Sequence, residues 1–182
     1  MNTIKKLIAA GILLVLAFPM VKDDDNTGGS SSSGGSSPPP ISPTGWDNIL
    51  NPQYMRTDSC GAGHYGANRT GGRIHKGVDI VCSEHQAVFA PFTGKITRSF
   101  NAYRNGSTFY KGIELSDEQG TKVKILYVYP NYNLVGQYVQ RGQQIATCQK
   151  ISNNYNCSMI DHLHIELWQN GVNADVTPYL NV

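Results

Sequence analysis

Two histidines one residue apart are the residues of this sequence best placed to do chemistry. His162 and His164 lie inside an apolar alternation formed by Leu163, Ile165 and Leu167. Because successive side chains of a β-strand point to opposite faces, both imidazoles would lie on one face while the aliphatic side chains fill the other. The stretch therefore predicts a strand that packs against a core and presents a histidine pair on its other face.

A second histidine and a carboxylate stand at an even spacing upstream. His75 and Asp79 are four residues apart, and Val78 and Ile80 alternate with Asp79 in the same stretch. On a strand, this spacing again puts both polar side chains on one face. Either pattern alone is often found without a metal, since a histidine pair is commonly solvated or hydrogen-bonded. Together, two imidazoles and a carboxylate match a three-ligand zinc site with a fourth position open to water, although other divalent ions also bind such sites.

Short segments of period-two hydrophobicity would have to carry these residues. Clusters of Gly, Asn, Pro and Asp separate them, and no stretch holds a convincing helical period. The expected strands are 78–81, 87–90, 95–100, 112–115, 122–128, 144–147 and 162–168. An Asn-Gly pair at 170–171 predicts a tight turn that folds the last strand back as a hairpin. We therefore expect a mostly β fold, a single antiparallel domain whose sheet carries the metal site on one face.

The chain divides into three parts by composition. Residues 1–21 carry two lysines before an uncharged apolar run, which predicts a secretory signal peptide, with an uncleaved membrane anchor as the alternative. Residues 22–44 are rich in Ser, Gly and Pro and predict a disordered linker, because they can bury little apolar surface. Residues 45–182 are long enough for one domain with its own core. We expect a secreted, extracellular protein.

Charge in residues 45–182 is nearly balanced. Twelve Lys and Arg stand against ten Asp and Glu, and the basic residues form no stripe. A nucleic-acid partner requires a basic surface, so we expect no nucleic-acid binding. We also expect no membrane partner, unless the signal stays uncleaved.

Four cysteines follow the export signal, so disulfides are expected. Three pairings are possible. We favour Cys60 with Cys82, which would tie the loop before the site to the strand after Asp79. Cys148 with Cys157 would then close the loop before the histidine pair. A cysteine as zinc ligand is disfavoured, because Cys82 is three residues from Asp79 and that odd spacing turns it to the opposite face.

Four segments resemble the lysostaphin-type zinc metallopeptidases, and the resemblance extends over nearly all of residues 45–182. These segments are 72–80, 87–96, 141–145 and 162–166. The resemblance implies the fold of that family, with a zinc site in a surface groove. It also implies zinc bound by His75, Asp79 and His164, while His162 stays off the metal and handles protons.

Two further positions bear on catalysis. Glu166 lies on the face of the histidine pair, where it is either a group that orients an imidazole or a solvated strand residue. Active members of the family carry a second catalytic histidine in a Tyr-x-His pattern, and the matching position here is Tyr129. A phenol cannot supply a cationic imidazolium, and losing such a donor typically costs about 100- to 1,000-fold in rate. The resemblance therefore implies zinc binding and a weakened catalytic apparatus.

Further segments, including 123–130, look like a narrower group of secreted animal proteins that keep the fold and zinc ligands but also lack the second histidine. We therefore expect a secreted zinc-binding domain that binds an extracellular receptor or glycan, with absent or weak proteolysis. The alternative is an active zinc endopeptidase that cleaves glycine-containing peptides such as peptidoglycan cross-links. A domain whose histidines bind nothing is the third possibility.

Overall fold

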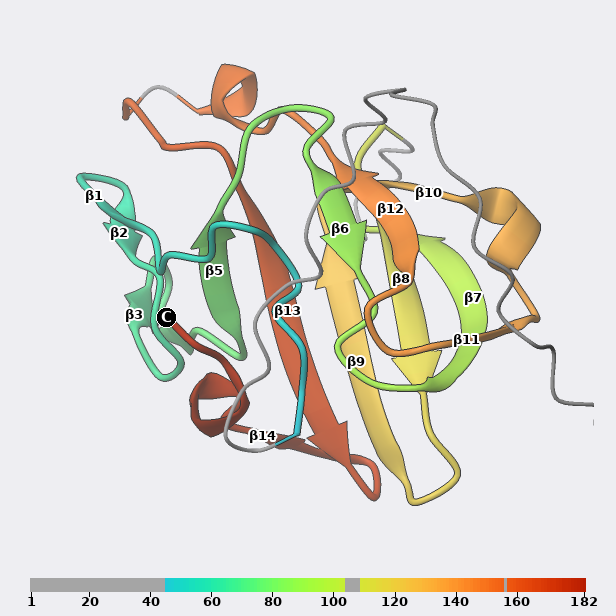
Figure 1. Cartoon of the computed structure of the whole chain (residues 1–182). Helices are drawn as coiled ribbons and strands as arrows, with labels where there is room; N and C mark the ends of the chain where they lie inside the picture. The colour runs from blue at the N-terminus through green and yellow to red at the C-terminus, as the bar shows by residue number, and fades with distance from the viewer. Residues whose placement is uncertain (1–44, 104–108, 156) are drawn as a thin grey trace, which may run out of the picture. The chain divides into compact units, whose positions relative to one another are not determined.

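The structure, a computed structural model, describes residues 45–103, 109–155 and 157–182 (Figure 1). The expected signal peptide 1–21 and linker 22–44 lie outside the described residues. Strands make up most of the regular structure, and the helical elements found in these ranges are short 3-10 turns. These turns are η1 (Tyr132–Leu134), η2 (Ser152–Asn154) and η3 (Thr177–Tyr179). No helix in the described part of the chain is long and apolar enough to cross a membrane.

One antiparallel sheet carries most of the strands. Its order is β11-β7-β8-β9-β13-β14, and β5 pairs with the first half of β13. The bounds are β5 (Val78–Val81), β7 (Gly94–Asn101), β8 (Lys111–Ser116), β9 (Thr121–Leu126), β11 (Tyr138–Val139), β13 (His162–Gln169) and β14 (Val172–Ala174). Strand β13 has β5 and β14 along one edge and β9 along the other. Residues on β13 are therefore held from both sides by backbone hydrogen bonds.

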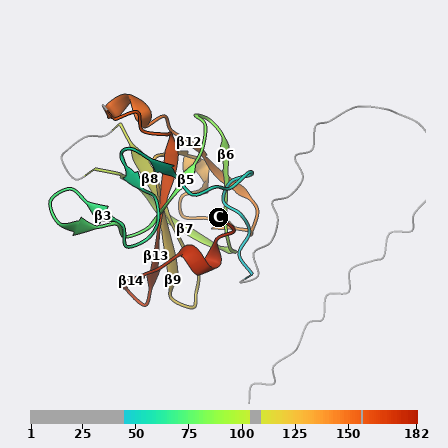
Figure 2. The same ribbon diagram turned by 90° about the vertical axis from the view of Figure 1, so that its left-hand side faces the viewer.

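A smaller sheet lies across one face of the large one (Figures 1 and 2). It contains β10 (Val128–Pro130), β12 (Gln144–Cys148) and β6 (Ala87–Phe89), in that order. Aliphatic side chains of both sheets meet in one buried cluster, in which Val88, Ile125 and Leu163 are fully buried. Burying such a side chain stabilises the fold by about 1.5–3 kcal/mol. The core between the sheets thus fixes the strands that carry the polar residues.

Two short hairpins precede β5. The first joins β1 (Thr57–Asp58) and β2 (Gly61–Ala62), and the second joins β3 (Asn68–Arg69) and β4 (Arg73–Ile74). The sequence did not predict these two-residue strands, because they are too short to show a period. They lie at the edge of the domain beside β5 (Figure 1).

The mostly antiparallel β fold predicted from the sequence is confirmed, and β5 has the predicted bounds. The predicted strand 122–128 is instead two strands, β9 and β10. Tyr127 between them adopts a φ of 66°, and this left-handed residue diverts the chain from the large sheet into the small one. The Asn-Gly hairpin is also confirmed, since Gln169 pairs with Val172 across a two-residue turn whose φ values are both positive.

The favoured disulfide pairing is wrong. Cys60 bonds to Cys157, 97 residues away, whereas Cys82 and Cys148 are free and buried in the core cluster. Strand pairing places Cys82 and Cys148 inside the domain, away from the loops that carry the other two cysteines.

Contacts between distant segments explain the observed bond. The β1–β2 hairpin lies beside the segment that enters β13, where the Ser59 hydroxyl donates to the carbonyl oxygen of Cys157 at 2.7 Å. Asp58 accepts the backbone N–H of Ile160 at 2.9 Å. Loop lengths in the sequence do not reveal such a contact, so reasoning from nearby cysteines chose the wrong partners.

Candidate metal centre

Antiparallel pairing of β5 with β13 brings the predicted ligands together. Asp79 lies directly opposite His164 in the register, and His75 lies in the connection that leads into β5. Gly77 allows this connection to approach β13 closely. A Cβ atom there would lie 2.1 Å from the carbonyl oxygen of Ile165 and 2.8 Å from the His164 ring. Any larger residue would push His75 away from the strand, so the site requires a glycine at this position.

Three donor atoms converge at this point. His75 Nε2, His164 Nδ1 and Asp79 Oδ1 are separated by 2.9 to 3.0 Å. Donor atoms around a tetrahedral zinc would be about 3.3 Å apart, so only a small expansion is needed. All three residues are buried, and together they form the one such cluster found among the described residues. The donor set therefore fits a divalent metal.

In each imidazole, the contact made by the outer nitrogen leaves the lone pair of the inner nitrogen directed at this point. His75 Nδ1 lies 2.8 Å from the carbonyl oxygen of His64, to which it donates, so Nε2 of the neutral ring is left as an acceptor. His164 Nε2 faces Oε1 of Glu166 at 3.5 Å, which leaves its Nδ1 for the centre. Two ring lone pairs and a carboxylate oxygen thus meet in a buried space. A proton or a metal cation is needed to hold them there.

Glu166 is half-buried on β13 and is itself fixed. Its Oε2 accepts the indole N–H of Trp168 at 2.9 Å, and Lys124 lies 4.0 Å away. Between the two alternatives for this residue, the contacts favour a group that orients the His164 ring.

Protons compete with a metal for the centre. Burial alone would lower the pKa of His164, but hydrogen bonds to Asp79 and Glu166 outweigh burial and raise the pKa to about 9. Burial alone would raise the pKa of Asp79, but hydrogen bonds from His164 and His75 hold it well below its usual range. At neutral pH the metal-free centre is therefore a carboxylate beside an imidazolium, and a metal must displace that proton.

Two arginines that sequence reasoning missed hold the second oxygen of Asp79. Arg56 donates to Oδ2 from Nη2 at 3.0 Å and from Nε at 3.3 Å, and Arg69 donates from Nη2 at 3.1 Å. Arg56 is 2% exposed and also pairs with Asp58 at 2.7 Å. Because Oδ2 is occupied by guanidinium groups, only Oδ1 is left for a metal. The arginines come from irregular backbone and a two-residue strand, so no spacing marked them.

His162 lies beside the cluster without belonging to it. Its Nδ1 donates to the carbonyl oxygen of Ile160 at 2.7 Å, and its Nε2 lies 3.9 Å from Asp79 Oδ1. Burial lowers the pKa of His162 and outweighs the attraction of Asp79. The ring is therefore neutral at pH 7, with a lone pair that can accept a proton. The predicted division of roles between His162 and His164 stays a prediction that this geometry permits.

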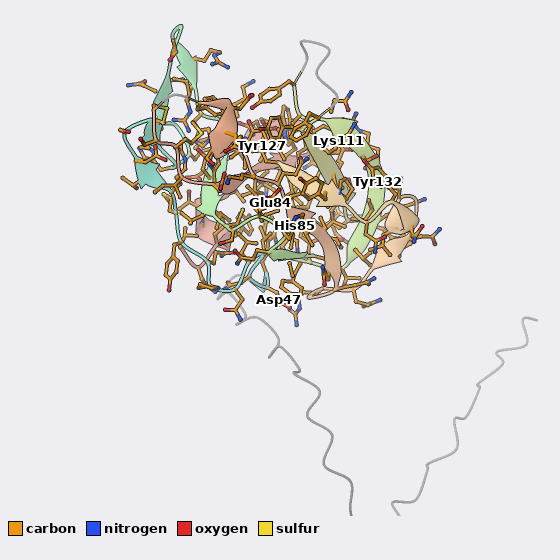
Figure 3. All side chains as sticks on the ribbon, turned by 90° about the horizontal axis from the view of Figure 1, so that it is seen from above. Asp47, Glu84, His85, Lys111, Tyr127 and Tyr132 are labelled. Carbon is orange, nitrogen blue, oxygen red and sulfur yellow. A yellow bond between two sulfur atoms is a disulfide. The ribbon has the colours of Figure 1, made fainter. Side chains whose placement is uncertain are left out.

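Tyr129 lies on β10, where its contacts are with residues outside the cluster. Its hydroxyl donates to Glu84 at 3.2 Å, and its ring stacks on His85 with centroids 5.4 Å apart. Tyr127 instead packs edge-on against His162, with centroids 5.8 Å apart. Figure 3 looks onto this end of the domain and labels Tyr127, Glu84 and His85. No spacing or residue type indicates this placement, because it follows from the left-handed backbone at Tyr127.

Comparison with known sequences identifies a family and relatives of this chain. The sequence model of peptidase family M23 matches residues 73–176. Leukocyte cell-derived chemotaxin-2 of Mus musculus is 38% identical over 139 residues, which covers 74% of this chain and 87% of that protein. The Bos taurus protein of the same name is 33% identical over 123 residues, covering 68% of this chain and 76% of the relative.

Solved structures show the same fold. The catalytic domain of the antimicrobial peptidase lysostaphin from Staphylococcus simulans matches with a TM-score of 0.55 at 23% identity, over 73% of this chain and 96% of that domain. The predicted resemblance to lysostaphin-type enzymes is therefore confirmed, and so is the resemblance to a narrower animal group, which is that of chemotaxin-2. This chain belongs to peptidase family M23.

Proposed function

We propose that this chain is an exported zinc-binding domain that binds an extracellular receptor or glycan, with absent or weak proteolysis. His75, Asp79 and His164 would hold the zinc, because two imidazoles and a carboxylate are donors that zinc accepts. Oxidised Cys60 and Cys157 fit an extracellular location, since disulfides persist in oxidising compartments. The similarity to chemotaxin-2 also supports a signalling or binding role.

The observation that carries the proposal is the missing second imidazole. The chain has five histidines, of which two belong to the cluster with Asp79 and a third, His162, lies beside it. More fully, His75 and His164 are cluster members, His162 adjoins them, and His64 and His85 are exposed, as expected for surface histidines. The His85 ring stacks on Tyr129 rather than on the cluster. No imidazole is thus left to stabilise the charge that develops on a scissile carbonyl.

A second candidate is an active zinc endopeptidase that cleaves glycine-containing peptides such as peptidoglycan cross-links. The geometry of His162 favours it, because a neutral imidazole 3.9 Å from Asp79 is placed to take a proton. Bound zinc would lower the pKa of a water and polarise a carbonyl. Hydrolysis would then need a tyrosine hydroxyl to serve as the oxyanion donor.

The test is hydrolysis of an oligoglycine peptide and of purified peptidoglycan by the zinc-loaded full chain. His162→Ala and Tyr129→His are assayed beside it, with Tyr132→His as a matched control at an exposed tyrosine. The proposal predicts bound zinc and absent or slow turnover by the unmodified chain, with a gain of activity in Tyr129→His alone.

Turnover by the unmodified chain that is at least as fast as that of Tyr129→His and is lost in His162→Ala would overturn the proposal in favour of the endopeptidase. A chain that takes up no zinc would contradict both candidates, since each requires the metal.

A further inference from the structure

A pocket next to the metal centre has no role in the site described above. Its volume is about 570 Å³, within the range of pockets that bind small ligands. Aromatic side chains form its floor and walls: Tyr103, Phe109, Tyr110 and Tyr155. Tyr110 is 5% exposed, whereas Phe109 is 64% and Tyr155 is 37% exposed. Two aromatic rings are thus left open to a ligand.

A row of aromatic rings joins the pocket to the metal centre. The Tyr127 ring contacts Tyr103 and Tyr110 with centroids 5.9 and 6.0 Å apart, and it contacts His162 on its other side at 5.8 Å. The hydroxyls of Tyr103 and Tyr155 are hydrogen-bonded to each other at 2.8 Å. These contacts fix the walls relative to β13. A ligand in the pocket would lie one aromatic layer away from His162.

Polar groups surround the aromatic floor. Glu84, Lys150, Asn153 and Asn154 line the pocket, and all four are exposed. Among the lining residues that the structure describes, one carboxylate and one ammonium cancel in charge, so these residues favour neither an anion nor a cation. The amides, the carboxylate and the ammonium together offer both hydrogen-bond donors and acceptors.

We propose that this pocket binds a neutral oligosaccharide. A sugar ring has an apolar C–H face that packs on an aromatic ring, and hydroxyls at its edge that both donate and accept hydrogen bonds. This matches an aromatic floor inside a polar rim whose described residues carry no net charge. The inference deepens the proposed binding role, on which it rests, by naming the class of ligand.

Other ligand classes fit the pocket less well. Among the described lining residues, a sulfated or phosphorylated ligand would meet one lysine and one carboxylate, which together give no net attraction. A purely apolar ligand would cover Glu84 and Lys150 without hydrogen-bond partners, and burying such groups unpaired is unfavourable.

The test is titration of the full chain with cellotriose and with N-acetylated chitotriose, followed by calorimetry. Phe109→Ala and Tyr155→Ala remove the two exposed rings, and Tyr132→Ala removes an exposed ring elsewhere, 58% exposed and to the right of Glu84 in Figure 3. We expect saturable binding by the unmodified chain and about tenfold weaker binding by the two pocket variants. The Tyr132→Ala variant is expected to bind as the unmodified chain does.

Three results would overturn the inference: no saturable binding of either sugar, stronger binding of a sulfated heparin oligosaccharide or of triglycine, or equal weakening in Tyr132→Ala. Zinc uptake is measured on the same samples. Normal zinc uptake without sugar binding overturns the pocket inference alone, whereas sugar binding without zinc uptake contradicts the proposed zinc domain alone.

Discussion

The metal centre and the aromatic pocket lie side by side but are built differently. Asp79 and His164 lie on paired strands, opposite each other in register, and each is hydrogen-bonded to a second group of the site. The pocket is lined from loops and a 3-10 turn, and its polar rim is exposed. Strands fix donor atoms to the fraction of an ångström that a metal requires, whereas loops provide the surface on which ligand preference can change.

The largest expected effect concerns the loop side of this comparison. The Cys60–Cys157 disulfide spans 97 residues and ties the segment after the pocket residue Tyr155 to the β1–β2 hairpin. In the chain-entropy account, removing it lowers the free energy of unfolding by about 4–5 kcal/mol. Urea unfolding of a Cys60→Ser, Cys157→Ser double variant measures this change. A loss below about 1 kcal/mol would show that the bond does not restrain the unfolded chain.

The second effect concerns the strand side. Asp79→Ala leaves Arg56 buried with Asp58 as its remaining carboxylate and removes the partner of Arg69. Uncompensated buried charge typically costs about 3–5 kcal/mol. Urea unfolding of the metal-free variant should show a loss of this order. Glu118→Gln, at an exposed carboxylate, is the control and should change stability little. Equal effects would mean that the arginine contacts on Asp79 contribute nothing.

The third effect is a pH dependence of the metal-free centre. The pKa of His164 is raised from 6.5 to about 9, so its protonated form is favoured by folding. The stability that this pairing contributes is fully present below pH 6.5 and is lost as the pH rises through about 9. Urea unfolding at several pH values should show a decline over this window, on the order of 3 kcal/mol at most.

His164→Gln is the matched variant for that experiment. It cannot titrate, so its stability should be flat where that of the unmodified chain declines. The same decline in both proteins would assign the pH dependence to another group.

The smallest effect concerns the contribution of Glu166 to the zinc affinity of the metal centre. Glu166→Gln removes the negative charge that faces His164 Nε2 but keeps the size of the side chain. Loss of such a supporting group typically weakens metal affinity about 10- to 100-fold. A chelator competition titration with zinc measures the change. Unaltered affinity would identify Glu166 as a solvated strand residue, the alternative left open by the sequence.

The difference between strands and loops also decides what could be predicted from the sequence. Asp79, His162 and His164 were accessible because strand periodicity places even spacings on one face. His75 lies in the connection before β5 and not on a strand, so the expected periodicity does not account for its place in the site. The register of β5 on β13 brings Asp79 and His164 together, and the connection before β5 adds His75, which agrees with the resemblance on which the ligand set was based. Most of the strands were found for the same reason.

Contacts made by loops and short hairpins were not accessible. Arg56 and Arg69 reach Asp79 from segments without a period, and the Cys60–Cys157 bond joins regions 97 residues apart. Tyr127 breaks a predicted strand because its φ is positive, a conformation that residue type alone does not indicate for tyrosine. These features depend on tertiary packing, so neither propensity nor spacing reveals them.

The most direct test of the account is the zinc content of the protein. The unmodified chain, His164→Gln and His85→Gln are dialysed against zinc-containing and then zinc-free buffer, and bound metal is measured by plasma mass spectrometry. The account predicts one zinc per chain in the unmodified protein and in His85→Gln, whose imidazole lies outside the cluster, and almost none in His164→Gln. An unmodified chain without zinc, or full zinc content in His164→Gln, would contradict it.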